Sequence, residues 1–166
     1  SGLLMFSHGA MTALFFAAIG MIYERTHTRQ VDKLGGLLKV IPFLSTIFIV
    51  AGLCSLGLPG FSGFVAEMTV FQGAWQRPET FYRLATVLSC LSIVVTAVYI
   101  LRASGKAIMG PIVDEHHKHL KDATWNEKLA SIVLLLAILA IGTAPFWLTD
   151  LLSPGSEIIM NQLTAR

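Results

Sequence analysis

The sequence is poor in charged residues. Asp, Glu, Lys and Arg make up only 13% of its 166 residues, whereas 54% are hydrophobic and the mean hydropathy is +0.69. About a quarter of the residues of a typical soluble domain are charged, so this composition indicates a membrane protein. The formal net charge of +2 is too small to suggest binding to nucleic acid.

Motifs of soluble enzymes are missing as well. The sequence has no Gly-rich phosphate loop after a strand, no Cys-x-x-Cys pair and no nucleophile elbow. Its two cysteines, Cys54 and Cys90, both lie in apolar segments, where a small buried thiol is expected. The chain begins at Ser1 without a signal peptide or an initiator Met, which we interpret as the start of a piece of a longer protein.

Long apolar segments dominate the sequence instead. A helix needs about 20 apolar residues to cross a hydrocarbon core of about 30 Å, and four regions approach or exceed that length: residues 3–23, 40–75, 84–101 and 129–148. We therefore predict an all-α, polytopic transmembrane helical bundle that occupies residues 1–166 without a separate soluble domain. Residues 151–166 are expected to form a short interfacial turn or helix.

The region 40–75 contains a break at residues 57–63, where Gly57, Pro59, Gly60 and Gly63 disfavour a continuous helix. In lipid such a break is tolerated only where it faces protein or a wet cavity. The region forms either two spans joined by a tight turn or the two halves of one discontinuous helix. The second half, residues 61–75, is short for a complete crossing, which favours the discontinuous helix.

The distribution of positive charge favours the same interpretation. A single crossing at residues 40–75 places nine of the twelve basic residues on one side, against seven for two crossings, and basic residues concentrate on the cytoplasmic side. The nine are Arg25, Arg29, Lys33, Lys39, Arg102, Lys106, Lys118, Lys121 and Lys128, and the other three are Arg77, Arg83 and Arg166.

Two ionisable residues are candidates for the functional site. Glu67 is the only charged residue well inside an apolar run, and His8 is the only histidine that is. An ionisable side chain at membrane depth costs several kcal/mol and usually marks an ion path or a proton relay. We hypothesise that Glu67 and His8 are steps of a proton relay beside the break. The alternatives are an ordinary loop with Glu67 just inside an interface, and a histidine satisfied by Ser7 or a neighbouring helix.

A cluster of possible metal ligands lies between the third and fourth apolar regions, in the segment Asp114-Glu-His-His-Lys-His119. Contiguous residues cannot all point at one ion on a regular element, and neither a Cys nor a distant His completes a closed site. We therefore interpret residues His116 to His119 as part of a solvated connection and expect no metal site, which leaves any other role of this loop open.

Several motifs, in this order, resemble a known family. They are Ser7-His-Gly-Ala-Met-Thr-Ala-Leu-Phe-Phe-Ala-Ala-Ile-Gly-Met-Ile-Tyr-Glu-Arg-Thr-His-Thr-Arg29, Gly35-Gly-Leu, Gly57-Leu-Pro-Gly and Phe64-Val-Ala-Glu67. Together they are similar to the antiporter-like chain M of bacterial NADH:quinone oxidoreductase (respiratory complex I), the NADH dehydrogenase subunit 4 family. The similarity is collinear from Ser7 to about Tyr99.

The resemblance implies an antiporter-like fold, of which this chain would hold the last four transmembrane helices. His8 would correspond to a histidine of the family's central hydrophilic axis, and Glu67 to the glutamate of its outward proton half-channel. The family's remaining channel residues would lie upstream of Ser1, so the chain alone is expected to be inactive.

The resemblance also implies a proton-translocating subunit that couples NADH:quinone oxidoreduction to proton transport. Its partners would be the lipid bilayer and other membrane-arm subunits of complex I, including neighbouring antiporter-like subunits. NADH, FMN, iron–sulfur clusters and quinone would belong to those subunits, so no cofactor is expected here. We expect a bacterial inner membrane rather than an organellar one. A subunit of a multisubunit cation/proton antiporter or of a membrane-bound hydrogenase, and a non-catalytic membrane-arm scaffold, remain alternatives.

Overall fold

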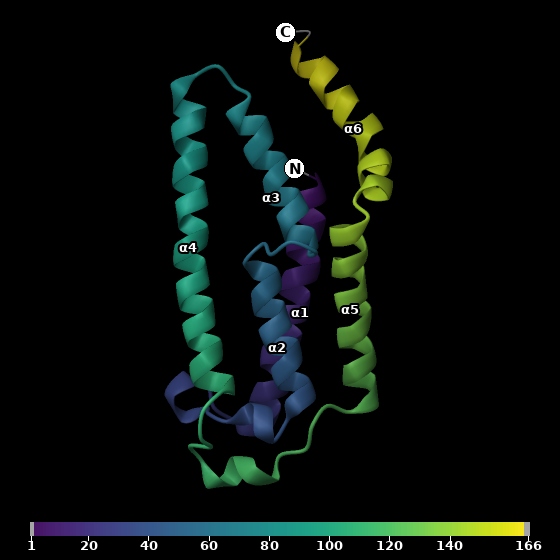
Figure 1. Ribbon diagram of the computed structural model, residues 1–166. Helices are drawn as coiled ribbons and strands as arrows, with labels where there is room; N and C mark the ends of the chain where they lie inside the picture. Colours follow the sequence, from purple (N-terminus) through teal and green to yellow (C-terminus); the bar gives the residue numbers. More distant parts are fainter. Residues whose placement is uncertain (1, 165–166) are drawn as a thin grey trace.

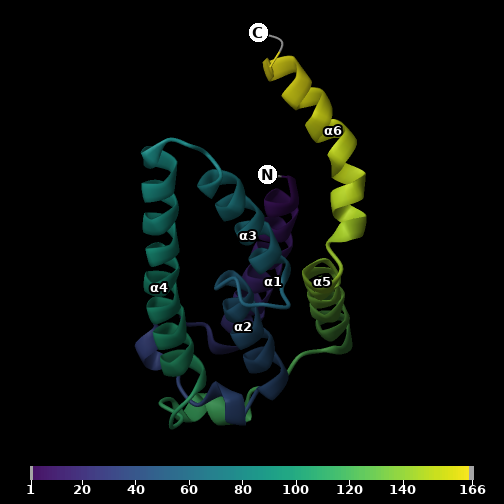
Figure 2. The same cartoon turned by 45° about the horizontal axis from the view of Figure 1, so that its top comes forward.

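The computed structural model describes residues 2–164, with side chains described up to residue 156. Over that range the protein consists of helices and their connections, which confirms the predicted all-α class (Figures 1 and 2). The long helices are α1 (Gly2–Thr26), α2 (Pro42–Ser55), α3 (Ser62–Trp75), α4 (Thr80–Ile108), α5 (Trp125–Thr143) and α6 (Phe146–Thr164). Three short 3-10 helices, η1 (Val31–Lys33), η2 (Leu37–Lys39) and η3 (Glu115–His119), lie in the connections.

Three of the helices, α1, α4 and α5, are long and apolar enough to cross a membrane. At a rise of 1.5 Å per residue, the 25 residues of α1 extend about 38 Å and the 29 residues of α4 about 44 Å. Both exceed a hydrocarbon core of about 30 Å. The predicted ranges 3–23 and 84–101 lie inside these helices, which continue into their polar flanks.

The discontinuous helix is confirmed. Helices α2 and α3 follow one another in the same direction and together cross the bundle once (Figure 1). Each has 14 residues, about 21 Å, which is too short to span a membrane alone. The helix is interrupted because Gly57 and Gly60 adopt φ values of +64° and +99°, in a region where a side chain is strained. Pro59 lies between them.

Helix α1 is the centre of the bundle and packs against α2, α3, α5 and α6. Its Leu14 and Ala18 are fully buried among residues of α2 and α5. Helix α4 lies at one edge, against α2 and α3 (Figure 1). Much of its length exposes apolar side chains such as Leu91, Val95 and Val98, as suits a surface that meets lipid or another membrane segment.

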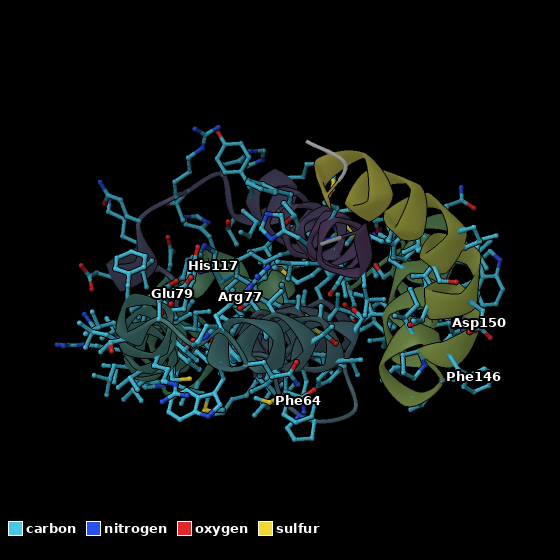
Figure 3. The ribbon with its side chains drawn as sticks, turned by 90° about the horizontal axis from the view of Figure 1, so that it is seen from above. Phe64, Arg77, Glu79, His117, Phe146 and Asp150 are labelled. Atoms are coloured by element: carbon cyan, nitrogen blue, oxygen red, sulfur yellow. The ribbon has the colours of Figure 1, made fainter. Side chains whose placement is uncertain are left out.

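The C-terminal part differs from the prediction. The fourth apolar region, residues 129–148, was expected to be one helix, but α5 begins at Trp125 and ends at Thr143. It begins early because Thr124 and Glu127 form a capping box, and it ends shortly before Pro145. Helix α6 then starts at Phe146, upstream of the expected tail 151–166, whose residues 165 and 166 lie outside the described range. Figure 3 shows Phe146 and Asp150 of α6 at the edge of the bundle far from α4.

The basic end of the bundle is held together by Arg25 at the end of α1. Its guanidinium donates to the Lys121 carbonyl oxygen at 2.7 Å and to the Glu127 carboxylate of α5 at 2.8 Å. The neighbouring Asp122 carboxylate accepts hydrogen bonds from the backbone N–H groups of Phe43 and Leu44 at 2.9 and 3.3 Å. These N–H groups lie in the first turn of α2, where they lack partners within the helix. The connection between α4 and α5 therefore fixes both α1 and α2.

Candidate functional site

The break between α2 and α3 is where four helices meet. Helix α1 contributes Ser7 and helix α5 contributes Gly142, while α2 and α3 contribute their facing ends. At the C-terminal end of α2, the N–H of Gly57 donates to the Cys54 carbonyl at 3.2 Å. A discontinuous helix presents backbone polar groups in the interior of the bundle, and these groups need polar partners.

Glu67 places its carboxylate at this break. The residue is half-buried on α3, and its side chain turns back toward Gly57. A Cβ atom built on Gly57 would collide with Glu67 Oε2 and would lie 3.3 Å from Oε1. The carboxylate thus rests against backbone that only a glycine leaves uncovered. Within the part of the chain that the structure describes, Glu67 has neither an ion pair nor a hydrogen-bond partner.

The sequence did not reveal a second polar feature of the break, a buried pair of serines. Ser7 of α1 and Ser62, the first residue of α3, are 2% and 1% exposed, and their Oγ atoms are 2.8 Å apart. A Cβ atom on Gly63 would lie 3.9 Å from Ser7 Oγ and 3.2 Å from the Cys54 carbonyl oxygen. The small residue at 63 therefore lets α1 and the end of α2 approach the start of α3.

His8 does not face the break in this chain. It lies on an exposed part of α1, whereas the preceding residue, Ser7, is the one turned inward. Successive residues of an α-helix point in directions about 100° apart, so adjacent residues lie on different faces of the helix. The structure brings Gly57, Gly63 and Glu67 together, and it gives His8 no hydrogen bond to the described residues.

The remaining break residues contact α5 or solvent. A Cβ atom on Gly142 of α5 would collide with the Gly60 carbonyl oxygen and would lie 2.6 Å from the carbonyl carbon of Phe61. Backbone thus meets backbone at this point, in the manner that small residues allow between membrane helices. Pro59 is exposed, as is Gly60. Helix α5 therefore packs directly against the turn that separates α2 from α3.

The histidine-rich segment forms η3, in the connection between α4 and α5. His117 is buried, whereas His116 and His119 are exposed, so the three imidazoles do not converge on one point. Among the described residues no group of His, Cys, Asp and Glu is arranged to hold a metal ion. The sequence did not predict the burial of His117.

Chemically, the break offers one ionisable group among uncharged ones. The hydroxyls of Ser7 and Ser62, the carbonyl of Cys54 and the backbone at Gly57 can accept or donate hydrogen bonds, but only Glu67 can gain or lose a proton. A carboxyl group that has no cationic partner and lies beside an open helix end suits proton exchange rather than charge pairing.

Comparison with known proteins agrees with this architecture. Residues 1–92 match the family model described as NADH:quinone oxidoreductase/Mrp antiporter, transmembrane. NADH-quinone oxidoreductase subunit M of Rickettsia felis is 34% identical over 141 residues, which are 85% of this chain and 28% of that protein. NAD(P)H-quinone oxidoreductase chain 4 1 of Synechococcus sp. (strain JA-2-3B'a(2-13)) is 39% identical over 148 residues. That match covers 85% of this chain and 28% of that protein.

A solved structure is similar as well. One chain of respiratory complex I from Thermus thermophilus with bound NADH has a TM-score of 0.71 and 28% sequence identity, over 82% of this chain and 28% of that one. The present chain thus spans about 28% of the length of the relatives it matches. The resemblance noted in the sequence is confirmed, and the chain belongs to the transmembrane family of NADH:quinone oxidoreductase and Mrp antiporter subunits, with subunit M, or chain 4, among its relatives.

Proposed function

We propose that the protein containing this chain translocates protons as a membrane subunit of an NADH:quinone oxidoreductase, and that Glu67 is one of its proton carriers. The observation that carries the proposal is the position of the Glu67 carboxylate, against the bare backbone of Gly57 where the membrane helix is interrupted. The names of the relatives support the complex and its reaction. These names do not say which residues carry the proton.

In this mechanism Glu67 takes up a proton from the interior of the subunit and releases it toward the side where α3 ends. His8 is the proposed donor to this part of the path. It faces away from the present chain, so in the longer protein its imidazole is free to meet a neighbouring segment. Reduction of quinone elsewhere would shift the local electrostatic potential and thereby the proton affinity of Glu67. The chain alone would lack the entry side of the path and would be inactive.

The proposal extends to cofactors, partners and location. NADH, FMN, iron–sulfur clusters and quinone would bind to other subunits, and this chain would contact the lipid bilayer and neighbouring antiporter-like subunits. Relatives from Rickettsia and Synechococcus fit a bacterial inner membrane. A cation/proton antiporter subunit is the second candidate, because the matching family model includes Mrp antiporters.

Infrared difference spectroscopy tests whether Glu67 changes its protonation state. The complete complex is compared at rest and during NADH-driven turnover, and we expect a carboxyl C=O band that disappears in Glu67→Gln. The matched control is Glu79→Gln, because Glu79 is exposed at the turn between α3 and α4 (Figure 3), and this variant should keep the band. A spectrum without any Glu67-dependent band would contradict the proposal. A band that responds to a sodium gradient but not to quinone reduction would favour the antiporter.

A second prediction concerns the position of the carboxylate. Gly57→Ala puts a Cβ atom where Glu67 Oε2 lies, so the flexible side chain has to move away from the break. We expect proton pumping per quinone reduced to fall about tenfold or more, because proton transfer depends on the position of the group.

Gly60→Ala is the control for that substitution. Gly60 also has a positive φ, +99°, so alanine adds backbone strain there of about 1–2 kcal/mol. A Cβ atom at Gly60 would meet no other atom within 4 Å. Pumping should therefore stay close to wild type in every Gly60→Ala complex that assembles. Equal losses in the two variants would mean that strain, rather than displacement of the carboxylate, causes the defect.

A further inference from the structure

The buried serine pair at the break differs from two other fully buried serines. Ser45 and Ser131 are 0% and 1% exposed, and their Oγ atoms have no hydrogen-bond partner among the described residues. Ser7 and Ser62 instead bond to each other across 55 positions of sequence, and either oxygen can be the donor. The pair joins the central helix α1 to the first residue of the second half of the discontinuous helix.

A pair of hydroxyls can reverse its hydrogen bond. Each hydroxyl has one hydrogen and two acceptor lone pairs, so in the pair one hydrogen is shared and the other is free to bond elsewhere. When Ser7 donates, the free hydrogen is on Ser62, and when Ser62 donates it is on Ser7. Rotation of the two hydroxyls therefore changes which helix carries the free hydrogen, without transferring a hydrogen or forming a charge in the resting state.

Two glycines, Gly63 and Gly57, lie between the pair and the carboxylate. The Cβ position of Gly63 lies 3.9 Å from Ser7 Oγ and 3.7 Å from the Cα atom of Gly57. Gly57 in turn contacts the Glu67 carboxylate. Neither glycine has a side chain that would separate Ser7 Oγ from the carboxylate, and the Cys54 carbonyl oxygen beside Gly63 is a hydrogen-bond acceptor there.

We propose that Ser7 and Ser62 form a reversible hydroxyl relay that passes protons from the side of α1 to Glu67. The proposal rests on the proposed role of Glu67 as a proton carrier. An incoming proton binds to the Oγ of Ser7 as the hydrogen of Ser7 passes to Ser62, and Ser62 releases its own hydrogen through a bridging water to the carboxylate. Both serines end as neutral hydroxyls, Glu67 ends protonated, and rotation of the hydroxyls restores the starting arrangement. The two serines are thus relay residues, and neither gains or loses a proton overall.

Single alanine substitutions in the complete complex, reconstituted in vesicles, test the relay. We expect Ser7→Ala and Ser62→Ala each to slow NADH-driven proton pumping about tenfold or more and to change its solvent deuterium isotope effect. The double variant should be no slower than the worse single variant, because either substitution alone breaks the path. Ser62→Thr keeps the hydroxyl and should pump at close to the wild-type rate.

Ser131→Ala is the control for loss of a buried hydroxyl, since Ser131 is equally buried in α5 but has no hydrogen-bond partner in the described part of the chain. Wild-type pumping in an assembled Ser7→Ala complex would overturn the relay. The relay would also be overturned if Ser131→Ala lowers pumping as much as Ser7→Ala and Ser62→Ala do. The same holds if the loss of pumping in each variant is fully explained by its loss of thermal stability. If Glu67→Gln abolishes pumping while both serine variants pump normally, only the relay is wrong. If Glu67→Gln pumps normally, the proposed function itself fails.

Discussion

Glu67→Gln is expected to lower coupled proton pumping by about a hundredfold, a typical contribution of a group that transfers a proton, while the complex remains assembled. Glutamine has nearly the same size and shape as glutamate, but its amide cannot take up and release a proton at working pH. The substitution breaks no ion pair, because Glu67 forms none with the described residues. Pumping and NADH:quinone reduction are measured together in sealed vesicles, and the amount of assembled complex is measured in detergent extracts.

Two outcomes would decide between the functions considered. Glu79→Gln, at the exposed turn before α4, should leave both rates at their wild-type values and so controls for the loss of a carboxylate as such. Wild-type coupling in Glu67→Gln would contradict the proton-carrier role and would favour a non-catalytic scaffold. Loss of the assembled complex in Glu67→Gln would instead assign the carboxylate a structural role.

Gly142→Ala is expected to have the largest effect on stability. The added Cβ would collide with the Gly60 carbonyl oxygen and come within 2.6 Å of the Phe61 carbonyl carbon. These are backbone atoms of the turn that separates α2 from α3, so neither can rotate out of the way. We expect a loss of about 3 kcal/mol, at the upper end of what overpacking usually costs, because α5 has to move away from the break. The free energy of unfolding is measured by denaturant titration in detergent.

The control for this substitution is Gly73→Ala. Gly73 also lies within a helix, α3, but a Cβ there would meet no other atom within 4 Å. Alanine has the higher helix propensity by about 1 kcal/mol, so this variant should be as stable as wild type or slightly more stable. If the Gly142→Ala protein is as stable as the Gly73→Ala protein, α5 does not pack directly against the break.

The sequence was sufficient to predict the discontinuous helix. Gly57, Pro59 and Gly60 act locally, through backbone preferences that do not depend on the rest of the chain, and the structure has positive φ at both glycines. The single crossing also follows from local information, because the basic residues flanking each apolar region indicate which ends lie on the same side. In the structure the end of α1, the end of α4 and η3 gather at one end of the bundle (Figure 1).

The sequence was not sufficient to predict contacts between distant segments. Ser7 and Ser62 are separated by 55 positions, and no local pattern indicates which of the two adjacent residues, Ser7 or His8, faces the break. The close approach of Gly142 to Gly60 depends on how α5 packs, which hydropathy does not specify. The relay formed by Glu67 and His8 thus stays a prediction, and the buried hydroxyls at the break come together only through tertiary packing.

The connection between α4 and α5 has a practical consequence for engineering this protein. Because the Lys121 carbonyl binds Arg25 and Asp122 caps α2, residues 121 and 122 hold the end of α1 and the start of α2 in place. An affinity tag, a fluorescent label or a deletion introduced there would release the ends of two membrane helices at once. The short turn between α3 and α4, with Arg77 and Glu79 exposed to solvent, is the better place to attach a probe.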